Sequence, residues 1–193
     1  MNKKELKKLL NNMSEQEQLE AVKRNGVAIQ YINNPSEKVQ LEAIRENGIA
    51  IKFINNPSER LQLEAVRSNG YYIRYINNPS ERVKLEAVSR KGNAINFIYK
   101  PSEEVQLEAV RRNGLAIRYI ENPSKYVKSI IDVIETSRRP IYVLHELNKE
   151  PLFSIGCQYN ITKEYFIQRI HEEDGGLEQN PHRQEYLDIL NRY

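Results

Sequence analysis

The chain has 193 residues, with 29 Lys and Arg against 26 Asp and Glu and a formal net charge of +3, a charge too mild to indicate nucleic-acid binding on its own. Cys157 is the single cysteine, so an intramolecular disulfide cannot form and a reducing compartment is favoured. The N-terminal sequence has no apolar signal segment, and no stretch of sequence is long and apolar enough to span a bilayer. We therefore expect a cytoplasmic protein with no membrane partner.

A 22-residue period organises most of the sequence. One serine and one glycine return at this interval, at Ser14, Ser36, Ser58, Ser80, Ser102 and Ser124 and at Gly26, Gly48, Gly70, Gly92 and Gly114. A fixed period in this range is typical of repeat proteins, in which each unit is too small to bury its own apolar face and stacks on its neighbours. Five copies span residues 14–123, and a sixth keeps only its first helix.

Each repeat is expected to form a helix, a glycine turn, a short helix and an asparagine–proline turn. In the second repeat, Asn34 is predicted to be the N-cap, with Pro35 at the first helical position and Glu37 completing a capping box. The helix should end at Asn47, with Gly48 in the left-handed conformation that closes many helices. The apolar segment that follows has room for about six residues of α- or 3₁₀-helix.

The predicted fold is an all-α, right-handed α-solenoid with a C-terminal helical unit. Residues 1–13 should form an N-terminal capping helix, residues 14–135 the solenoid, and residues 136–193 a C-terminal helical domain or cap. Near the C-terminus, helices are expected at residues 126–134, 140–147, 163–174 and 181–193. Residues 152–159 are ambiguous between a short helix and a strand.

Stacking turns each repeat position into a row of equivalent side chains. We expect an aromatic row to fill the core between the short helices and a glutamate row to pair with basic residues of its own helix. We expect a glutamine row to bond backbone groups of nearby turns, with a polar strip lining a groove as the alternative. The rows are Tyr31, Phe53, Tyr75, Phe97 and Tyr119; Glu20, Glu42, Glu64, Glu86 and Glu108; and Gln18, Gln40, Gln62, Lys84 and Gln106.

Two basic rows are the candidates for a partner-binding surface. One lies near the ends of the long helices, at Lys23, Arg45, Arg67, Ser89 and Arg111, and the other on the short helices, at Gln30, Lys52, Arg74, Asn96 and Arg118. The candidate binding residues are Arg45, Lys52, Arg67, Arg74, Arg111 and Arg118. Such regular charges either solvate a face or bind something acidic, a protein or a nucleic acid. Ser89 and Asn96 interrupt both rows in the fourth repeat, which favours a discrete protein partner over a continuous phosphate backbone.

The repeat resembles a known family. Its fifth copy contains Val-Gln-Leu-Glu-Ala-Val-Arg-Arg-Asn-Gly-Leu-Ala-Ile-Arg-Tyr-Ile, from Val105 to Ile120. This unit is similar to short α-helical repeats of unknown function in bacterial, phage and giant-virus proteins, which carry an Ala-Val-x-x-Asn-Gly-x-Ala-Leu-x-Tyr-Ala core. The resemblance covers residues 14–123. It implies an α-helical array, often in effector-like or mobile-element proteins, and it brings neither an assigned activity nor catalytic residues.

Residues suited to catalysis or metal binding are sparse. His145, Cys157, His171 and His182 share no metal-ligand spacing, and no nucleophile signature surrounds Cys157. We therefore predict a non-enzymatic interaction protein without cofactor or metal, an adaptor or inhibitor of phage or pathogen type that binds an acidic protein surface. Nucleic-acid binding is the first alternative. An enzyme with its site in the C-terminal unit is the second.

Overall fold

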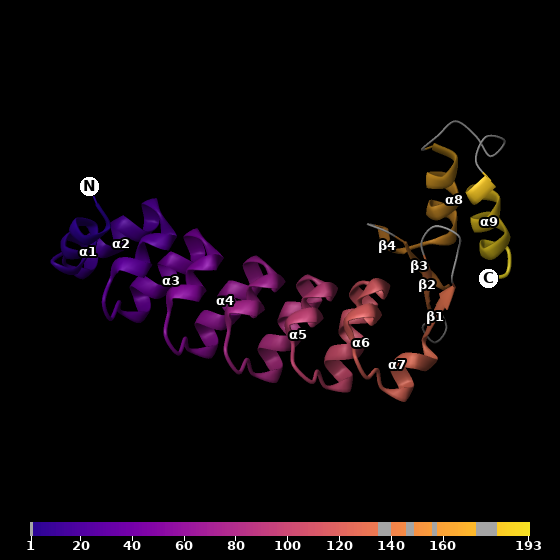
Figure 1. Ribbon diagram of the computed structural model, residues 1–193, viewed down its shortest axis with the longest axis horizontal. Coiled ribbons are helices and arrows are strands. Elements are labelled where there is room, and N and C mark those ends of the chain that lie inside the picture. Colours follow the sequence, from indigo (N-terminus) through magenta and orange to yellow (C-terminus); the bar gives the residue numbers. More distant parts are fainter. Residues whose placement is uncertain (1, 135–139, 146–148, 156–157, 173–180) are drawn as a thin grey trace. The chain divides into compact units, whose positions relative to one another are not determined.

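The computed structural model describes residues 2–134, 140–145, 149–155, 158–172 and 181–193 (Figure 1). The chain divides into two compact units, Met1–Tyr99 and Lys100–Tyr193. Four repeats lie in the first unit, and the fifth lies in the second together with a small sheet.

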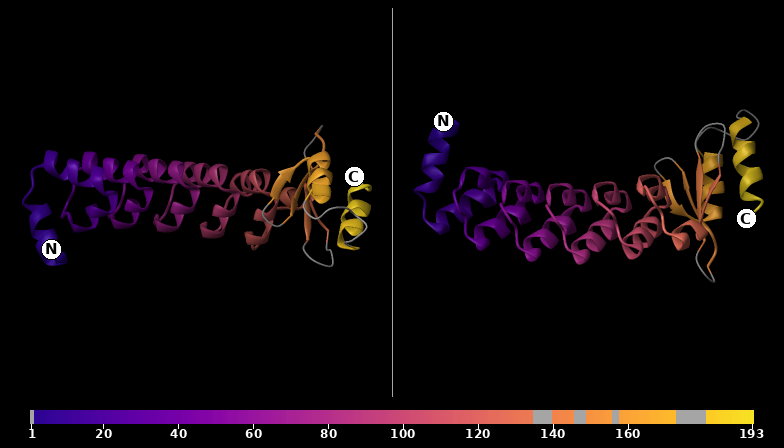
Figure 2. Two further views of the ribbon diagram at one scale, coloured as in Figure 1. Left: turned by 90° about the horizontal axis from the view of Figure 1, so that it is seen from above. Right: turned by 60° about the horizontal axis from the view of Figure 1, so that its bottom comes forward.

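The four repeats of the first unit follow a short helix, α1 (Lys3–Asn11). Each repeat is an α-helix of 10 residues followed by a 3₁₀-helix of 6 residues. The pairs are α2 (Glu15–Arg24) and η1 (Gly26–Tyr31), α3 (Glu37–Glu46) and η2 (Gly48–Phe53), α4 (Glu59–Ser68) and η3 (Gly70–Tyr75), and α5 (Glu81–Arg90) and η4 (Gly92–Phe97). In Figure 2 the long helices of this unit form one row and the 3₁₀-helices a second. The predicted helical repeat and N-terminal helix are confirmed.

Serine, not asparagine, caps the long helices. Helix α3 begins at Glu37, and Ser36 Oγ accepts a hydrogen bond from the Val39 N–H at 3.4 Å. Asn34 lies before the helix with a φ of 49°, in the left-handed region that asparagine tolerates better than most residues. The predicted cap is therefore wrong, because the asparagine and its proline both belong to the turn. The same turn recurs at Asn56, Asn78 and Lys100, with φ of 48°, 50° and 45°.

At Gly26 and Gly70, the glycine after the long helix is needed for the close approach of the next repeat's backbone. Asn69 ends α4 in an extended conformation (φ −159°, ψ 117°), and its side chain accepts a hydrogen bond from the Tyr71 N–H at 3.0 Å. A Cβ atom on Gly70 would lie 2.2 Å from the carbonyl oxygen of Ala87 in the next repeat, and Gly70 does not have a left-handed φ. The predicted left-handed glycine is therefore wrong. The asparagine turns the chain, and the glycine leaves room for the backbone of the neighbouring repeat.

Apolar residues on two sides of each long helix form the core of the first unit. Val39, Ala43 and Ile44 of α3 are fully buried, as are Ala65 and Val66 of α4. The 3₁₀-helices add Ile29, Ile51, Ile73 and Ile95. A helix with two apolar flanks packs between the preceding and the following copy, so its stability comes from stacking and not from its own length.

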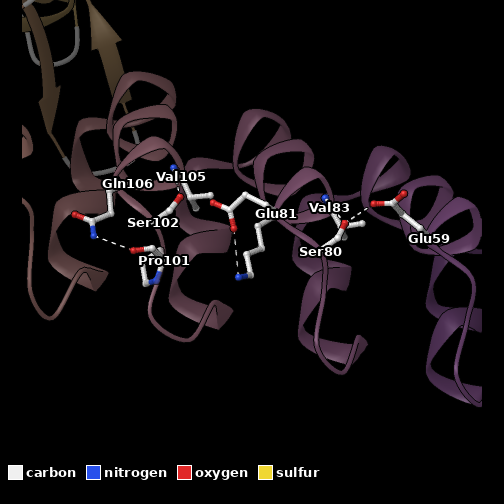
Figure 3. A network of polar contacts seen from close by, with 9 residues as sticks. Glu59, Ser80, Glu81, Val83, Pro101, Ser102, Val105 and Gln106 are labelled. Atoms are coloured by element: carbon white, nitrogen blue, oxygen red, sulfur yellow. Dashed lines mark hydrogen bonds and ion pairs between the residues drawn. The ribbon is translucent and has the colours of Figure 1, made fainter.

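A serine–glutamate ladder links successive repeats of the first unit at the starts of their long helices. The hydroxyl of Ser80 donates to a carboxylate oxygen of Glu59 in the preceding repeat (Figure 3). Ser58 donates in the same way to Glu37, at 3.0 Å. Ser36 and Ser80 therefore accept from their own helix and donate to the helix before it, whereas Ser58 only donates.

The glutamine row bonds backbone groups, as predicted. Gln40 Nε2 donates to the carbonyl oxygen of Pro35 at 2.7 Å. In the second unit, Gln106 Nε2 donates to Pro101 at 3.0 Å (Figure 3), and its Oε1 accepts from the Ser124 N–H at 2.9 Å. Gln40, Gln62 and Gln106 hold the turns before their own helices, which explains why an amide stands at a position near the core, whereas Lys84 contacts Glu81 instead.

The second unit is not all-α, which corrects the predicted fold class. It comprises α6 (Glu103–Arg112), η5 (Gly114–Tyr119), α7 (Lys125–Ser129), β1 (Ile131–Ile134), β2 (Ile141–Leu144), β3 (Leu152–Ile155), β4 (Gln158–Ile161), α8 (Lys163–Glu172) and α9 (Pro181–Leu190). The strands form an antiparallel sheet in the order β1-β2-β3-β4. The predicted C-terminal helical unit is therefore a sheet with two helices.

Two predicted helices are replaced by strands. The helix expected over residues 126–134 ends at Ser129, and β1 follows. The helix expected over residues 140–147 is strand β2 as far as Leu144, and residues 146–147 lie outside the described part. Both segments are rich in Ile and Val, whose branched side chains suit a strand as well as an apolar helix face. The helices expected from Lys163 and Pro181 are confirmed.

Strand β2 is buried along its whole length, with all four residues covered. On one face, the core consists of Ile141, Val143, Phe153, Phe166, Ile189 and Leu190, from β2, β3, α8 and α9. On the other face, Tyr142 and Ser154 lie against Gly114 of η5. Helices α8 and α9 therefore cover one face of the sheet, and the fifth repeat covers the other. A strand covered on both faces is apolar throughout.

Asn160 of β4 joins the sheet to the fifth repeat. Its Oδ1 accepts a hydrogen bond from the Gly114 N–H at 3.0 Å, and its amide nitrogen donates to the carbonyl oxygen of Arg111. Ser154 Oγ in turn accepts from the Asn160 N–H at 2.9 Å. These two residues occupy the position at Gly114 that the next repeat occupies at Gly70.

Candidate binding surface

The fifth residue of each 3₁₀-helix in the first unit faces solvent. A 3₁₀-helix has three residues per turn, so its first and fourth residues share one face, which packs on the core at Gly48 and Ile51. The fifth residue lies off that face and is exposed to solvent. These exposed residues are Gln30, Lys52, Arg74 and Asn96.

Lys52 and Arg74 lie over aromatic rings of two successive repeats. Lys52 Nζ is 5.9 Å from the ring centroid of Phe53 and 5.8 Å from that of Tyr75. Arg74 Cζ is 5.7 Å from the centroid of Tyr75 and 4.6 Å from that of Phe97. Rings and cations therefore alternate along the first unit. At these distances each contact contributes about 0.5–1 kcal/mol at an exposed site.

Tyr71 completes this arrangement. Its ring centroid is 5.8 Å from Arg74 Cζ and 6.2 Å from that of Phe97, in an edge-to-face pair. Its carbonyl oxygen accepts a hydrogen bond from Arg74 Nε at 2.9 Å. We define the cation–aromatic stripe as Lys52, Phe53, Tyr71, Arg74, Tyr75 and Phe97.

The aromatic row does not fill the core, which corrects the expectation from sequence. Phe97 is 39% exposed and Tyr119, in the second unit, is 42% exposed. Tyr31, Phe53 and Tyr75 are half-buried. The isoleucines at the fourth position of the short helices already fill the space between repeats, so the rings lie at its border with one part in water.

The basic row of the long helices has different partners. Arg45 Nε lies 3.2 Å from Glu64 Oε1, and Arg67 Nε lies 3.8 Å from Glu86 Oε1. Each pair joins one repeat to the next, whereas the expected pairing within a helix occurs between Lys23 and Glu20, at 3.1 Å, and between Arg90 and Glu86, at 3.0 Å. The glutamate row therefore places a carboxylate beside Arg45 and another beside Arg67. The structure thus separates the two basic rows, one ion-paired and one placed over rings.

Arg111 and Arg118 belong to the second unit. Arg118 is exposed at the fifth position of η5, the position that Arg74 has in η3. Arg111 lies in the last turn of α6, and its backbone carbonyl accepts the hydrogen bond from Asn160. These two cations therefore occupy the helix positions that Arg67 and Arg74 have in the first unit.

A hollow of about 530 Å³ adjoins the stripe at Phe53. Its wall comes from the turns and side chains of the first two repeats, including Gln30, Asn33, Asn34, Phe53 and Asn55. Amide side chains predominate here, so the hollow suits a polar group better than an apolar one.

A separate polar cluster lies beside the sheet of the second unit. His145 Nε2 is 3.0 Å from Asp132 Oδ2, and the Tyr193 hydroxyl donates to the same oxygen at 3.2 Å. Burial and the neighbouring carboxylate raise the pKa of Tyr193. These contacts tie β1 to the segment after β2 and to the segment after α9, a structural role that accounts for all three side chains.

Among the residues that the structure describes, no group of side chains favours the enzyme alternative. Within the described ranges, no group of three or more His, Cys, Asp and Glu side chains could hold a metal ion. Cys157 and the side chains of His171 and His182 lie outside the described residues. Where the chain is described, no helix combines the length and apolar character needed to cross a bilayer.

No family model matches the chain, and no curated protein or solved structure matches it. The resemblance to the short helical repeats of unknown function stays a prediction. The proposed function therefore rests on the cation–aromatic stripe.

Sequence reasoning identified Lys52 and Arg74 but not their setting. Tyr71 was missed because the second position of the short helix is Val27, Ile49, Tyr71 and Asn93 in successive repeats, so it forms no row. Arg74 lies three residues after Tyr71, which is one turn of a 3₁₀-helix, so only the 3₁₀ geometry shows that the two side chains share a face.

Proposed function

We propose that the protein is a non-enzymatic interaction protein that binds an acidic protein surface through the short-helix face of its repeats. The observation that supports this proposal is the cation–aromatic stripe, in which Lys52 and Arg74 are exposed and lie over rings instead of carboxylates. Arginine and aromatic side chains supply most of the binding energy in protein interfaces. The ion-paired Arg45 and Arg67 have a smaller role in this proposal than they had in the sequence analysis.

The proposal includes finer features that were expected from the sequence. The repeats wind as a right-handed solenoid, and Arg118, at the equivalent short-helix position of the fifth repeat, is also a partner-binding residue. The protein acts in the cytoplasm as an adaptor or inhibitor of phage or pathogen type. The single cysteine supports a reducing compartment.

A matched pair of double variants tests the proposal. Lys52→Glu with Arg74→Glu, the stripe variant, reverses the exposed short-helix charges. Lys38→Glu with Arg60→Glu, the control variant, makes the same exchange in the same repeats, at exposed positions near the starts of long helices. A photo-crosslinker at position 97 first captures the partner, which is then purified and titrated. We expect the stripe variant to lose binding and the control variant to keep it, with unchanged circular dichroism in both.

Binding retained by both variants would overturn the proposal, because the stripe would then not be needed. Loss of binding by both would also overturn it, because the effect would then follow net charge and not the stripe. Tyr31, which lies one repeat before Phe53 on the neighbouring short helix, offers a second crosslinking position.

Nucleic-acid binding is the second candidate, and the alternation of rings with cations favours it. Single-stranded nucleic acids bind to such surfaces because bases stack on aromatic rings while cations contact phosphates. Gln30 and Asn96 interrupt the cations on either side of the stripe, which leaves few phosphate contacts. Titration with a single-stranded oligonucleotide at several salt concentrations separates the two, because phosphate binding weakens log-linearly and steeply with salt.

A further inference from the structure

We infer that the cation–aromatic stripe binds an extended acidic segment in the polyproline II conformation, with one acidic residue at every third position. This inference rests on the proposed function and names the kind of partner segment. It follows from the charge, the orientation and the spacing of the stripe.

The two cations of the stripe have no acidic partner among the residues that the structure describes. Lys52 and Arg74 are in contact with rings, whereas Arg45 and Arg67 have carboxylates. A cation held over a ring keeps its full charge, so a carboxylate of a binding partner forms an ion pair with it. Charge complementarity therefore selects an acidic occupant.

Arg74 is already oriented for such a partner. Its Nε donates to the Tyr71 carbonyl at 2.9 Å, and its guanidinium carbon lies 4.6 Å from the centroid of Phe97. These contacts fix the plane of the group and leave the two terminal nitrogens to bind a carboxylate in the paired geometry that arginine favours. A group that is ordered before binding loses less entropy on binding.

The spacing of the stripe selects the conformation of the occupant. Lys52 and Arg74 occupy the same position in successive repeats, and stacked helices lie about 10 Å apart. A polyproline II segment advances about 9 Å in three residues and returns to the same face. A β-strand returns to the same face every two residues, after about 7 Å. Acidic residues three apart in polyproline II therefore match the repeat.

The rings suit the residues between the acids. Phe53, Tyr75 and Phe97 present half-exposed faces at one per repeat, on either side of each cation. Aromatic surfaces bind proline-rich segments because these segments are already extended and lose little entropy on binding. An acid followed by two apolar residues, of which proline is the best suited, places its charge on a cation and its apolar part on a ring.

Two peptides of identical composition test the inference. The first consists of four Glu-Pro-Pro triplets; the second has the same residues with glutamate at every second position and the remaining prolines at the end. We expect the intact protein to bind the first at least about tenfold more tightly in fluorescence anisotropy. The stripe variant should lose this binding, and the control variant should keep it.

Equal affinity for the two peptides would overturn the inference and leave the proposed function intact, because charge without spacing would then suffice. Tighter binding of a helical peptide with glutamates seven residues apart, which also advances about 10.5 Å, would overturn it as well. If only a single-stranded oligonucleotide binds, and the stripe variant abolishes that binding, both the inference and the acidic-protein proposal are wrong.

Discussion

The stacking surface of the repeat is completed differently in the two units. In the first unit, Gly70 faces the backbone of the next repeat, at the carbonyl of Ala87. In the second unit, Gly114 faces the side chains of Ser154 and Asn160, which belong to a sheet with no repeat pattern. A repeat cannot leave its stacking face in water. The comparison shows that the repeat requires a surface of the right shape and hydrogen-bonding pattern, and that this surface need not be another repeat.

The largest effect is expected from a charge placed between two repeats. Ala65 is fully buried in α4, so Ala65→Glu adds both volume and an unpaired charge to the stacking surface. We expect a loss of about 3–5 kcal/mol, measured as a shift of the urea unfolding midpoint by circular dichroism. The neighbouring Glu64→Ala is the control and should cost less than about 1 kcal/mol. An unchanged midpoint for Ala65→Glu would mean that this position is not part of the core.

A pair of glycine variants compares the two units directly. Gly70→Ala would place Cβ 2.2 Å from a backbone oxygen, which cannot move without moving α5. Gly114→Ala would place Cβ 2.9 Å from Ser154 Oγ, the end of a short side chain. We expect losses of about 2–3 kcal/mol for the first and about 1 kcal/mol for the second in urea unfolding. The reverse order would show that the sheet is the less adaptable partner.

Asn160 tests whether the sheet completes the fifth repeat through hydrogen bonds. Asn160→Gly removes the side chain that accepts from Gly114 and donates to Arg111, while glycine tolerates the φ of 52° at this position. We expect a loss of about 1–2 kcal/mol, because two backbone groups lose their partners. Asn160→Ala should cost more, since it adds backbone strain. No change with glycine would assign the stabilisation to apolar packing of the sheet alone.

The regular part of the fold could be predicted because the sequence repeats it. One helix, one short helix and one turn, inferred once, apply to every copy with the same spacing. The wrong predictions concern the helix cap and the glycine, whose roles the 22-residue period cannot distinguish. Asn34, Pro35 and Ser36 recur together at most 22-residue steps, with Lys100 as the exception at the asparagine position, so periodicity alone does not tell which of them caps the helix. Gly70 is equally regular whether a turn or a neighbouring backbone requires it.

The sheet could not be predicted with the same rules. Ile131–Ile134 and Ile141–Leu144 are short apolar segments, and such segments suit a buried strand or a helix face. Their conformation follows from hydrogen bonds between strands and from packing on α8 and α9, which are contacts between distant residues. The stripe was found only in part for a related reason. Lys52 and Arg74 stand out in sequence, but their placement over rings depends on the neighbouring repeat.

The smallest effect is expected from the ion pairs that recur between repeats of the first unit. Arg45 and Glu64 form a 3.2 Å contact, and their side chains are 54% and 31% exposed. Water and salt screen such a pair, so Arg45→Gln should cost less than about 1 kcal/mol, and the cost should fall further at high salt. A double-mutant cycle with Glu64→Gln measures the coupling free energy. Lys52→Gln, which removes the same charge from the short helix, should change stability no more than this and weaken partner binding instead. If Arg45→Gln weakened binding as much as Lys52→Gln, the ion-paired row would belong to the binding surface, and the separation of the two rows would be wrong.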